Sequence, residues 1–289
     1  MLTIGSPIRL LSGYILFKIL TMQEFNPEIL KQLYQPEADS HKGQNGKLLI
    51  IAGSALFHAP LIWSAQIASR LVDMVYIAST PENNEIVKSL KTKFQNGIVI
   101  PRSDINSYIN EADCILIGPG LPRKEGEQSG DDDTKKLTES ILSTKSQLVL
   151  DGGALQTIDK SQISVGAILT PHVREFEMLF GNNKKVQDMA KQHSCIILLK
   201  GQVDIVCSPD KCVTISGGNP GMTKGGTGDV LAGLVAALAC KNDPFLATTA
   251  GSYLNKKAGE LLAETVGNNF NATDLLNQIP QTISFKTGF

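Results

Sequence analysis

A glycine-rich segment in the last third of the chain carries the residues best suited to chemistry. Residues 217–229 contain six glycines and end in Gly225-Gly226-Thr227-Gly228-Asp229, after which an apolar stretch over 230–239 predicts a helix. Glycine lets the backbone approach a ligand closely, and the free amides and dipole at a helix N-terminus bind anions. The segment therefore predicts a binding loop for a phosphate group, including one in transfer.

Asp229 is the unusual member of this segment, because a carboxylate repels a phosphate. Its presence is explained if it faces the attacking hydroxyl group, where it accepts the proton or orients the nucleophile. The alternative is a structural role, in which Thr227 or Asp229 caps the helix and the glycines form a turn. The loop is not a Walker motif, and no Gly-x-Gly-x-x-Gly fingerprint follows the first predicted strand.

The elements that position this loop alternate between short apolar runs and helix-like stretches. Such runs indicate an α/β fold whose parallel sheet is covered on both faces, and ligands of such sheets bind outside the carboxyl ends of the strands. The residues that end the runs therefore predict one site. Strands are expected over 47–52, 75–78, 114–117, 148–150, 167–169 and 196–199, with a hairpin of 204–207 and 212–215; helices are expected over 60–71, 230–239 and 245–266, with a short final helix opening at 273–274.

Composition narrows the class of protein. The 289 residues are 42% hydrophobic and 19% charged, which is ordinary for a globular protein, and the net charge of -1 is spread without a basic patch. A nucleic-acid partner is therefore not expected. Residues 8–20 are mostly apolar but shorter than the ~20 residues that span a bilayer. They indicate a weak signal peptide or a start placed before the natural Met22. We set aside 1–21 as an uncertain extension and treat 22–289 as a single domain without a membrane segment.

Cysteine and acidic residues give no metal site. Cys207 and Cys212 do not form a Cys-x-x-Cys pair and have no histidine at ligand spacing, and the five cysteines favour a reduced, cytoplasmic protein. The other three, Cys114, Cys195 and Cys240, lie in apolar runs that predict burial. The charged stretch 124–134 is interpreted as a mobile surface loop rather than a metal site.

The run from Asn219 to Gly233 closely resembles the signature of the NAD(P)H-hydrate dehydratases, a family of the ribokinase-like superfamily. Further landmarks follow in the order typical of that family across about residues 41–280. They are His41-Lys42-Gly43, Gly53-Ser54 with Ala59-Pro60, Gly118-Pro119-Gly120-Leu121, 151–155, Thr170-Pro171-His172 with Glu175-Phe176, and Leu199-Lys200-Gly201. The resemblance implies a ribokinase-like three-layer α/β/α sandwich with a mostly parallel central sheet.

The same resemblance implies a repair reaction. ADP or ATP would phosphorylate the ring hydroxyl of hydrated NADH or NADPH (6S form), and loss of phosphate would restore the double bond. Mg²⁺ would accompany the nucleotide, because the sequence shows no dedicated metal cage. A homo-oligomer, a tetramer, is also implied. By matching positions, Asp229 would be the base; Ala59, Gly120, His172 and Asp229 would contact the dinucleotide; and Lys200, Gly201, Gln202, Val203, Asp204, Gly225, Gly226, Thr227 and Gly228 would bind the nucleotide.

Four departures from the family pattern fall on the substrate side. His58, Pro122 and Arg174 stand where the family often has glycine, and Gly153 stands where it often has aspartate. The residues alone also leave His172 open between a loop residue and a substrate contact. Two alternatives share the glycine loop and Asp229: a ribokinase-like kinase of a small alcohol, which would leave a phosphorylated product, and a catalytically silent nucleotide-binding module.

Overall fold

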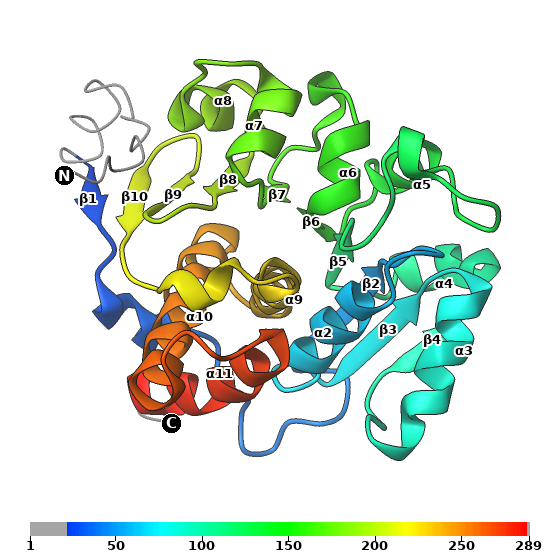
Figure 1. Cartoon of the computed structure of the whole chain (residues 1–289), viewed down its shortest axis with the longest axis horizontal. Coiled ribbons are helices and arrows are strands. Elements are labelled where there is room, and N and C mark those ends of the chain that lie inside the picture. The colour runs from blue at the N-terminus through cyan, green and yellow to red at the C-terminus, as the bar shows by residue number, and fades with distance from the viewer. Residues whose placement is uncertain (1–21, 288–289) are drawn as a thin grey trace, which may run out of the picture.

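The computed structural model describes residues 22–287, so the segment 1–21 lies outside the described residues. Its centre is a ten-stranded sheet of order β1-β10-β9-β8-β7-β6-β5-β2-β3-β4 (Figure 1). Within it, β9 runs antiparallel to both neighbours and every other neighbouring pair is parallel. The strands are β1 (Gln23–Glu24), β2 (Lys47–Ile51), β3 (Met74–Ala78), β4 (Ile98–Ile100), β5 (Cys114–Ile117), β6 (Gln147–Leu150), β7 (Ile168–Leu169), β8 (Ile196–Leu199), β9 (Asp204–Cys207) and β10 (Cys212–Ile215).

Both faces of the sheet are covered, as the continuous apolar runs predict. In β2, Leu48 and Ile50 belong to one core cluster, Leu49 and Ile51 to the other, and none of the four is exposed. A strand buried on both faces needs apolar residues at consecutive positions rather than at alternate ones. The predicted three-layer sandwich with a mostly parallel sheet is confirmed.

Helices form the two outer layers. The first core cluster contains residues of α2 (Ala59–Ala68), α3 (Pro81–Ser89), α9 (Thr227–Ala239), α10 (Pro244–Val266) and α11 (Ala272–Thr287). The second contains residues of α4 (Ile105–Ile109), α5 (Thr134–Ile141), α6 (Gly152–Thr157), α7 (Val173–Phe180) and α8 (Val186–Gln192). Short 3-10 helices are η1 (Pro27–Gln32), η2 (Leu90–Thr92), η3 (Arg102–Asp104), η4 (Lys124–Gly126), η5 (Lys160–Gln162) and η6 (Pro220–Thr223). Within residues 22–287, no helix combines the length and apolar composition needed to cross a membrane.

Several helix boundaries differ from the expected ones. The helix expected over 60–71 ends at Ala68, after which the Leu71 amide donates to the Ala68 carbonyl in a turn. The helix α3 was not predicted because its residues are mainly polar; it begins where the Thr80 hydroxyl accepts from the Asn83 amide and Pro81 takes the first position. The final helix is longer than expected and continues through Pro280.

The strand order creates the crevice. From β2 the chain continues outward to β3 and β4, and then β5 returns to the opposite side of β2. The connections that follow β2 and β5 therefore leave the sheet in opposite directions, which opens a gap outside the carboxyl ends of these two neighbouring strands. The glycine loop before α9 lies beside this gap.

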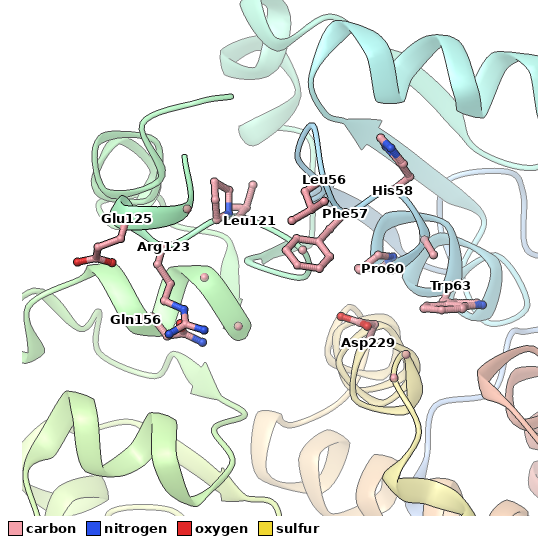
Figure 2. Close-up of a pocket in the computed structure, with 18 residues that line it drawn as sticks. Leu56, Phe57, His58, Pro60, Trp63, Leu121, Arg123, Glu125, Gln156 and Asp229 are labelled. Atoms are coloured by element: carbon pink, nitrogen blue, oxygen red, sulfur yellow. The ribbon is translucent and has the colours of Figure 1, made fainter. Parts of the chain in front are cut away.

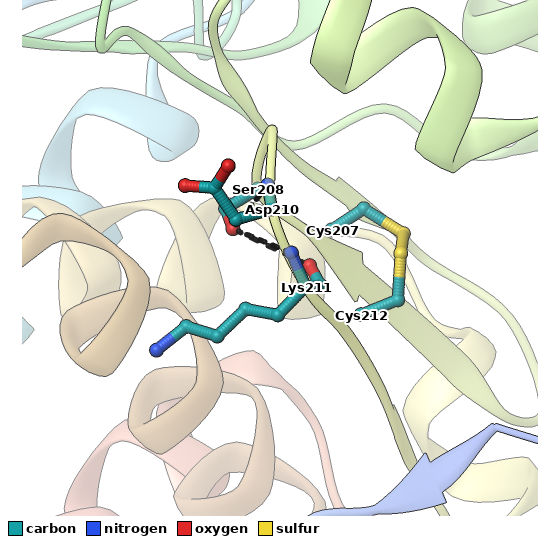
Figure 3. Close-up of a disulfide and its surroundings, with 5 residues drawn as sticks. All are labelled: Cys207, Ser208, Asp210, Lys211 and Cys212. Carbon is teal, nitrogen blue, oxygen red and sulfur yellow. Dashed lines mark hydrogen bonds between the residues drawn. A yellow bond between two sulfur atoms is a disulfide. The ribbon is translucent and has the colours of Figure 1, made fainter.

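The expectation of reduced cysteines is wrong for one pair. Cys207 and Cys212 form a disulfide across the β9–β10 hairpin (Figure 3), whereas Cys114, Cys195 and Cys240 are free and buried, as predicted. The two bonded residues are direct partners in the antiparallel register, so their side chains leave the hairpin on the same face. A search limited to Cys-x-x-Cys spacing misses such a pair, although the hairpin itself was predicted.

Mass spectrometry after thiol alkylation tests this pairing. Protein purified without reductant and denatured is expected to take up alkyl groups on three of its five cysteines, and on all five after reduction. Cys207→Ser removes one partner, so the four remaining cysteines should label without reduction. Labelling of all five cysteines in the unreduced wild-type protein would contradict the disulfide.

Candidate active site

A cavity of about 1070 Å³ opens at the carboxyl ends of the central strands. Its walls come from the connections after β2 and β5, the first turns of α2 and α6, and the start of α9 (Figure 2). The structure brings five of the predicted site residues to this cavity. They are Ala59, Gly120, Gly225, Gly226 and Asp229.

The glycine loop has the shape that an anion site needs. Gly226 adopts a left-handed conformation (φ 96°, ψ -22°) directly before α9, and a Cβ at this position would lie 2.4 Å from the ring of Trp63. Only glycine fits here. The Thr227 hydroxyl donates back to the carbonyls of Met222 and Lys224 at 2.7 and 3.0 Å, which fixes the loop. No side chain caps the helix, so the capping roles considered for Thr227 and Asp229 are not formed. The Thr227 amide donates to the Lys224 carbonyl at 3.4 Å, and the Gly228 amide that follows it remains open to a ligand.

Asp229 is the carboxylate at the floor of the cavity. It lies in the first turn of α9 and points toward the space between the α2 wall and the β5 loop (Figure 2). Burial raises its pKa, repulsion from Asp151 raises it further, and attraction from Lys200 lowers it, with a result of about 7. A carboxyl group with this pKa exchanges protons near neutral pH, as a general base requires.

Lys200 and Asp151 form a buried ion pair beside Asp229. The Lys200 ammonium lies 2.9 Å from the Asp151 carboxylate, with side chains only 19% and 6% exposed, and the Thr170 hydroxyl donates to the same carboxylate oxygen at 2.7 Å. Burial lowers the pKa of Lys200, but attraction from Asp151 and then Glu175 outweighs it, so the net pKa is raised. Lys200 therefore stays charged. Its Nζ also lies next to Gly228, because a Cβ built there would be 3.7 Å away.

The turn at 201–204 is held rigidly rather than left open. The Asp204 carboxylate accepts from the Gly201 amide at 2.8 Å and from the Ser252 hydroxyl at 2.7 Å. Lys256, which is 8% exposed at its side chain, lies 3.3 Å from Asp204 and donates to the carbonyls of Gly201 and Gln202. Asp204 is thus an internal anchor of the turn, while Gln202 and Val203 lie at its surface outside the cavity lining.

His172 lies outside the cavity lining. Its Nδ1 accepts from the Glu175 amide at 3.2 Å, and the Glu175 carboxylate accepts from the His172 amide at 3.0 Å, which forms a capping box on α7. The His172 side chain is 53% exposed. Lys200, Thr227 and Gly228 also lie behind the lining rather than on it.

The departures from the family pattern divide between the cavity and the surface. His58, Pro122 and Gly153 line the cavity, whereas Arg174 lies exposed on α7 away from it. A Cβ at Gly153 would lie 2.2 Å from the Leu121 carbonyl oxygen. The loop carrying Pro122 therefore packs so closely on α6 that aspartate at position 153 would displace it.

Sequence reasoning missed several residues of the site. Lys256 lies in the helix expected over 245–266, to which no site residue was assigned, and Gln156 and Arg123 had no recognisable pattern around them. The acidic loop is also more ordered in its contacts than expected. Its Asp131 accepts from the Ala55 amide at 2.7 Å, which ties it to the cavity rim, and its Asp132 pairs with Arg102 at 2.6 Å. Among the described residues no cluster of His, Cys, Asp and Glu has the arrangement of a metal site.

Solved structures with this architecture define the class of fold. A ribokinase-like superfamily protein of Enterococcus faecalis matches with a TM-score of 0.80 and 23% identity, covering 92% of this chain and 96% of that one. An ADP/ATP-dependent NAD(P)H-hydrate dehydratase of Bacillus subtilis, co-crystallised with ATP and Mg²⁺, matches with a TM-score of 0.79 and 24% identity, covering 92% and 99%. The fold is ribokinase-like, as the sequence resemblance implies.

Sequence comparison then identifies the family. The family model described as NAD(P)H-hydrate dehydratase matches residues 48–281. An ADP-dependent (S)-NAD(P)H-hydrate dehydratase of Cenarchaeum symbiosum is 32% identical over 268 residues, which cover 85% of this chain and 91% of that protein. The chain belongs to the NAD(P)H-hydrate dehydratase family.

A second group of relatives is longer. A bifunctional NAD(P)H-hydrate repair enzyme of Archaeoglobus fulgidus is 32% identical over 257 residues, covering 86% of this chain but 53% of that protein. The chain spans about half the length of such bifunctional relatives.

Proposed function

We propose that this protein dehydrates hydrated NADH and NADPH (6S form) back to NADH and NADPH, with ADP or ATP as the phosphate donor. The observation that carries the proposal is the half-buried Asp229 carboxylate at the floor of the cavity, with a pKa of about 7. It lies in the first turn of α9, whose N-terminus follows the glycine loop and has no side-chain cap. Family membership and the printed names of the relatives support the choice of substrate.

The reaction proceeds in two chemical stages. Asp229 accepts the proton of the ring hydroxyl, whose oxygen attacks the terminal phosphorus of the nucleotide while the bond to the leaving AMP (from ADP) or ADP (from ATP) breaks. The C–O bond of the phosphorylated ring then breaks, inorganic phosphate departs, and loss of a neighbouring ring proton restores the double bond. Ala59, Gly120 and His172 remain the proposed contacts of the dinucleotide.

The nucleotide would bind at the glycine loop and extend toward the 200–204 turn, which lies outside the cavity lining. The open amide of Gly228 would receive the transferring phosphate, and Lys200 would supply positive charge behind Gly228. Asp204 and Lys256 act by keeping the turn in shape. Mg²⁺ would arrive with the nucleotide and would neutralise part of the phosphate charge, since no cluster of His, Cys, Asp and Glu among the described residues could hold a metal ion by itself.

Gly228→Val is expected to weaken ADP and ATP binding by about tenfold or more, because its methyl groups occupy the space in which a phosphate oxygen lies. A Cβ at this position meets only Lys200 Nζ at 3.7 Å, so the variant should still fold. Calorimetric titration measures the affinity, and an unchanged thermal midpoint serves as the folding control. Equal affinity in the variant and the wild type would place the phosphate elsewhere.

The rate is expected to rise with pH through a midpoint near 7. Only ionised Asp229 can accept a proton, and its pKa of about 7 means that the ionised fraction falls as the pH drops below that value. A profile of kcat/KM between about pH 5 and 9 reports this group in the free enzyme. A rate that stays constant across the acidic half of that range would exclude Asp229 as the titrating base.

Product analysis separates the proposal from a ribokinase-like kinase. Incubation of hydrated NADH with ADP or ATP should release one inorganic phosphate for each NADH formed, and no phosphorylated dinucleotide should accumulate. A stable phosphorylated product without NADH would show that the protein is a kinase. Nucleotide binding without either product would show that it is a catalytically silent nucleotide-binding module.

Two further properties remain proposals. We expect a homo-oligomer, a tetramer, from the family resemblance, and a cytoplasmic location from the three free cysteines. Light scattering coupled to gel filtration measures the first, and a monomeric mass would contradict it; fractionation of cells that produce the protein measures the second.

A further inference from the structure

The cavity wall opposite Trp63 carries one permanent cation whose role the reaction above leaves unassigned. Arg123 lies in the connection that follows β5 and lines the cavity. It is the one Arg or Lys side chain among the described lining residues. In Figure 2 its guanidinium lies beside Gln156 of α6, across the cavity from Trp63. The carboxylates that share the lining are Asp229 and Glu125.

Arg123 has no partner within the part of the chain that the structure describes. No hydrogen bond or ion pair of residues 22–287 involves its guanidinium, whereas Arg102 is half-buried and bound to Asp132 through two nitrogens. An arginine that is paired internally supports a loop, but one that faces a cavity without a partner keeps five donors for a ligand.

The backbone beneath Arg123 is held in place. The Leu121 amide donates to the Gly118 carbonyl at 3.0 Å, and the Gly126 amide donates to the Arg123 carbonyl at 2.8 Å. Pro122, which is buried, restricts the backbone between these two turns because its ring fixes φ. The side chain therefore starts from a defined point on the rim even though its tip is exposed.

Three other side chains of the wall already donate hydrogen bonds within the protein. Trp63 Nε1 donates to the Thr273 hydroxyl at 3.1 Å, and Gln156 Nε2 donates to Glu175 at 2.9 Å. His58 Nδ1 donates to Asn83 Oδ1 at 2.5 Å, and the His58 ring is turned away from Asp229 in Figure 2. On the described wall, Arg123 is therefore the side chain that can offer charge and free donors together.

Resting on the proposed function, we propose that Arg123 binds a phosphate group of the dinucleotide substrate while the hydrated ring lies at Asp229. A planar guanidinium pairs with phosphate oxygens through two parallel hydrogen bonds, and the other side chains of the wall are apolar, already hydrogen-bonded or carboxylates. The phosphate is either the pyrophosphate that NADH and NADPH share or the additional 2′-phosphate of NADPH.

Binding of NADH and NADPH, the products of the proposed reaction, tests this assignment without turnover. Trp63 is the sole tryptophan of the chain and lines the cavity, so its emission reports occupancy; calorimetry gives an independent affinity. Arg123→Ala should weaken dinucleotide binding by about tenfold or more and reduce its salt dependence. Arg123→Lys should retain part of the affinity, since it keeps the charge but loses the paired geometry.

Arg174→Ala is the matched control, because Arg174 is an exposed arginine outside the cavity and should bind both dinucleotides like the wild type. ADP affinity should be unchanged in all three variants. Equal losses of affinity for NADH and NADPH in Arg123→Ala would show that Arg123 binds the pyrophosphate. A loss of affinity for NADPH alone would show that it binds the 2′-phosphate. Wild-type affinity of Arg123→Ala for both would overturn the inference. Failure of the wild-type protein to bind either dinucleotide would instead overturn the proposed function, and the inference with it.

Discussion

Replacing Asp229 with asparagine is expected to lower turnover of hydrated NADH by about 100-fold or more, because the amide cannot accept the hydroxyl proton. The side chains are nearly equal in size, and the glycine loop is held by Gly226 and Thr227 rather than by the carboxylate. Nucleotide affinity should therefore persist. Steady-state kinetics and ADP titration measure the two effects, and an unchanged turnover would remove Asp229 from its role as the base.

The same substitution should make the protein more stable at neutral and alkaline pH. The pKa of Asp229 is raised from its ordinary 3.8 to about 7 by folding, so the folded protein holds a proton that the unfolded chain releases between these values. Wild-type stability must then fall as the pH rises from about 4 to 7. The amide of the variant does not titrate, so Asp229→Asn should lack this loss. Urea unfolding at about pH 4 and pH 8 measures the free energy of unfolding of both proteins. The value for Asp229→Asn minus that for the wild type should increase with pH. A difference that stays constant would show that burial does not disfavour the charged carboxylate.

Lys200→Met is expected to lower the free energy of unfolding by about 3 kcal/mol, because it leaves the Asp151 carboxylate buried without its counter-ion. Loss of the ammonium also removes the attraction that lowers the pKa of Asp229, so the midpoint of the pH–rate profile should move above its wild-type value. Urea unfolding and the pH profile measure these effects separately.

Two further variants serve as controls for Lys200. Adding Asp151→Asn to Lys200→Met removes the unpaired charge and should recover much of the lost stability. Lys88→Met breaks the i,i+3 pair with Glu85, whose side chains are 55% and 72% exposed, and should cost less than about 1 kcal/mol. A loss of stability at Lys200 no larger than that at Lys88 would contradict a structural role for the buried pair.

The fold could be predicted because its signals are local. The central buried strands are continuous apolar runs, and Gly225 and Gly226 directly precede α9, so the layers and the proposed phosphate loop follow from neighbouring residues. The charge environment of Asp229 could not be predicted in the same way. Asp151 and Lys200 are 49 residues apart and meet only because β6, β7 and β8 end at the same edge of the sheet.

The remaining differences also depend on spatial pairing. The disulfide required the register of the β9–β10 hairpin, which places Cys207 opposite Cys212. The cap formed by His172 required knowing that α7 begins at Val173. Arg123 lies in an exposed loop without periodicity. The role proposed for it depends on its position among the residues that line the cavity, which the sequence does not show.

The central claim is tested most directly by following the recovery of NADH from its hydrate in the presence of Mg²⁺ with ADP, with ATP or without nucleotide. Recovery should require a nucleotide, release an equal amount of phosphate and be slowed about 100-fold or more in Asp229→Asn. Nucleotide-independent recovery, or no recovery by a protein that binds ADP and ATP tightly, would contradict it.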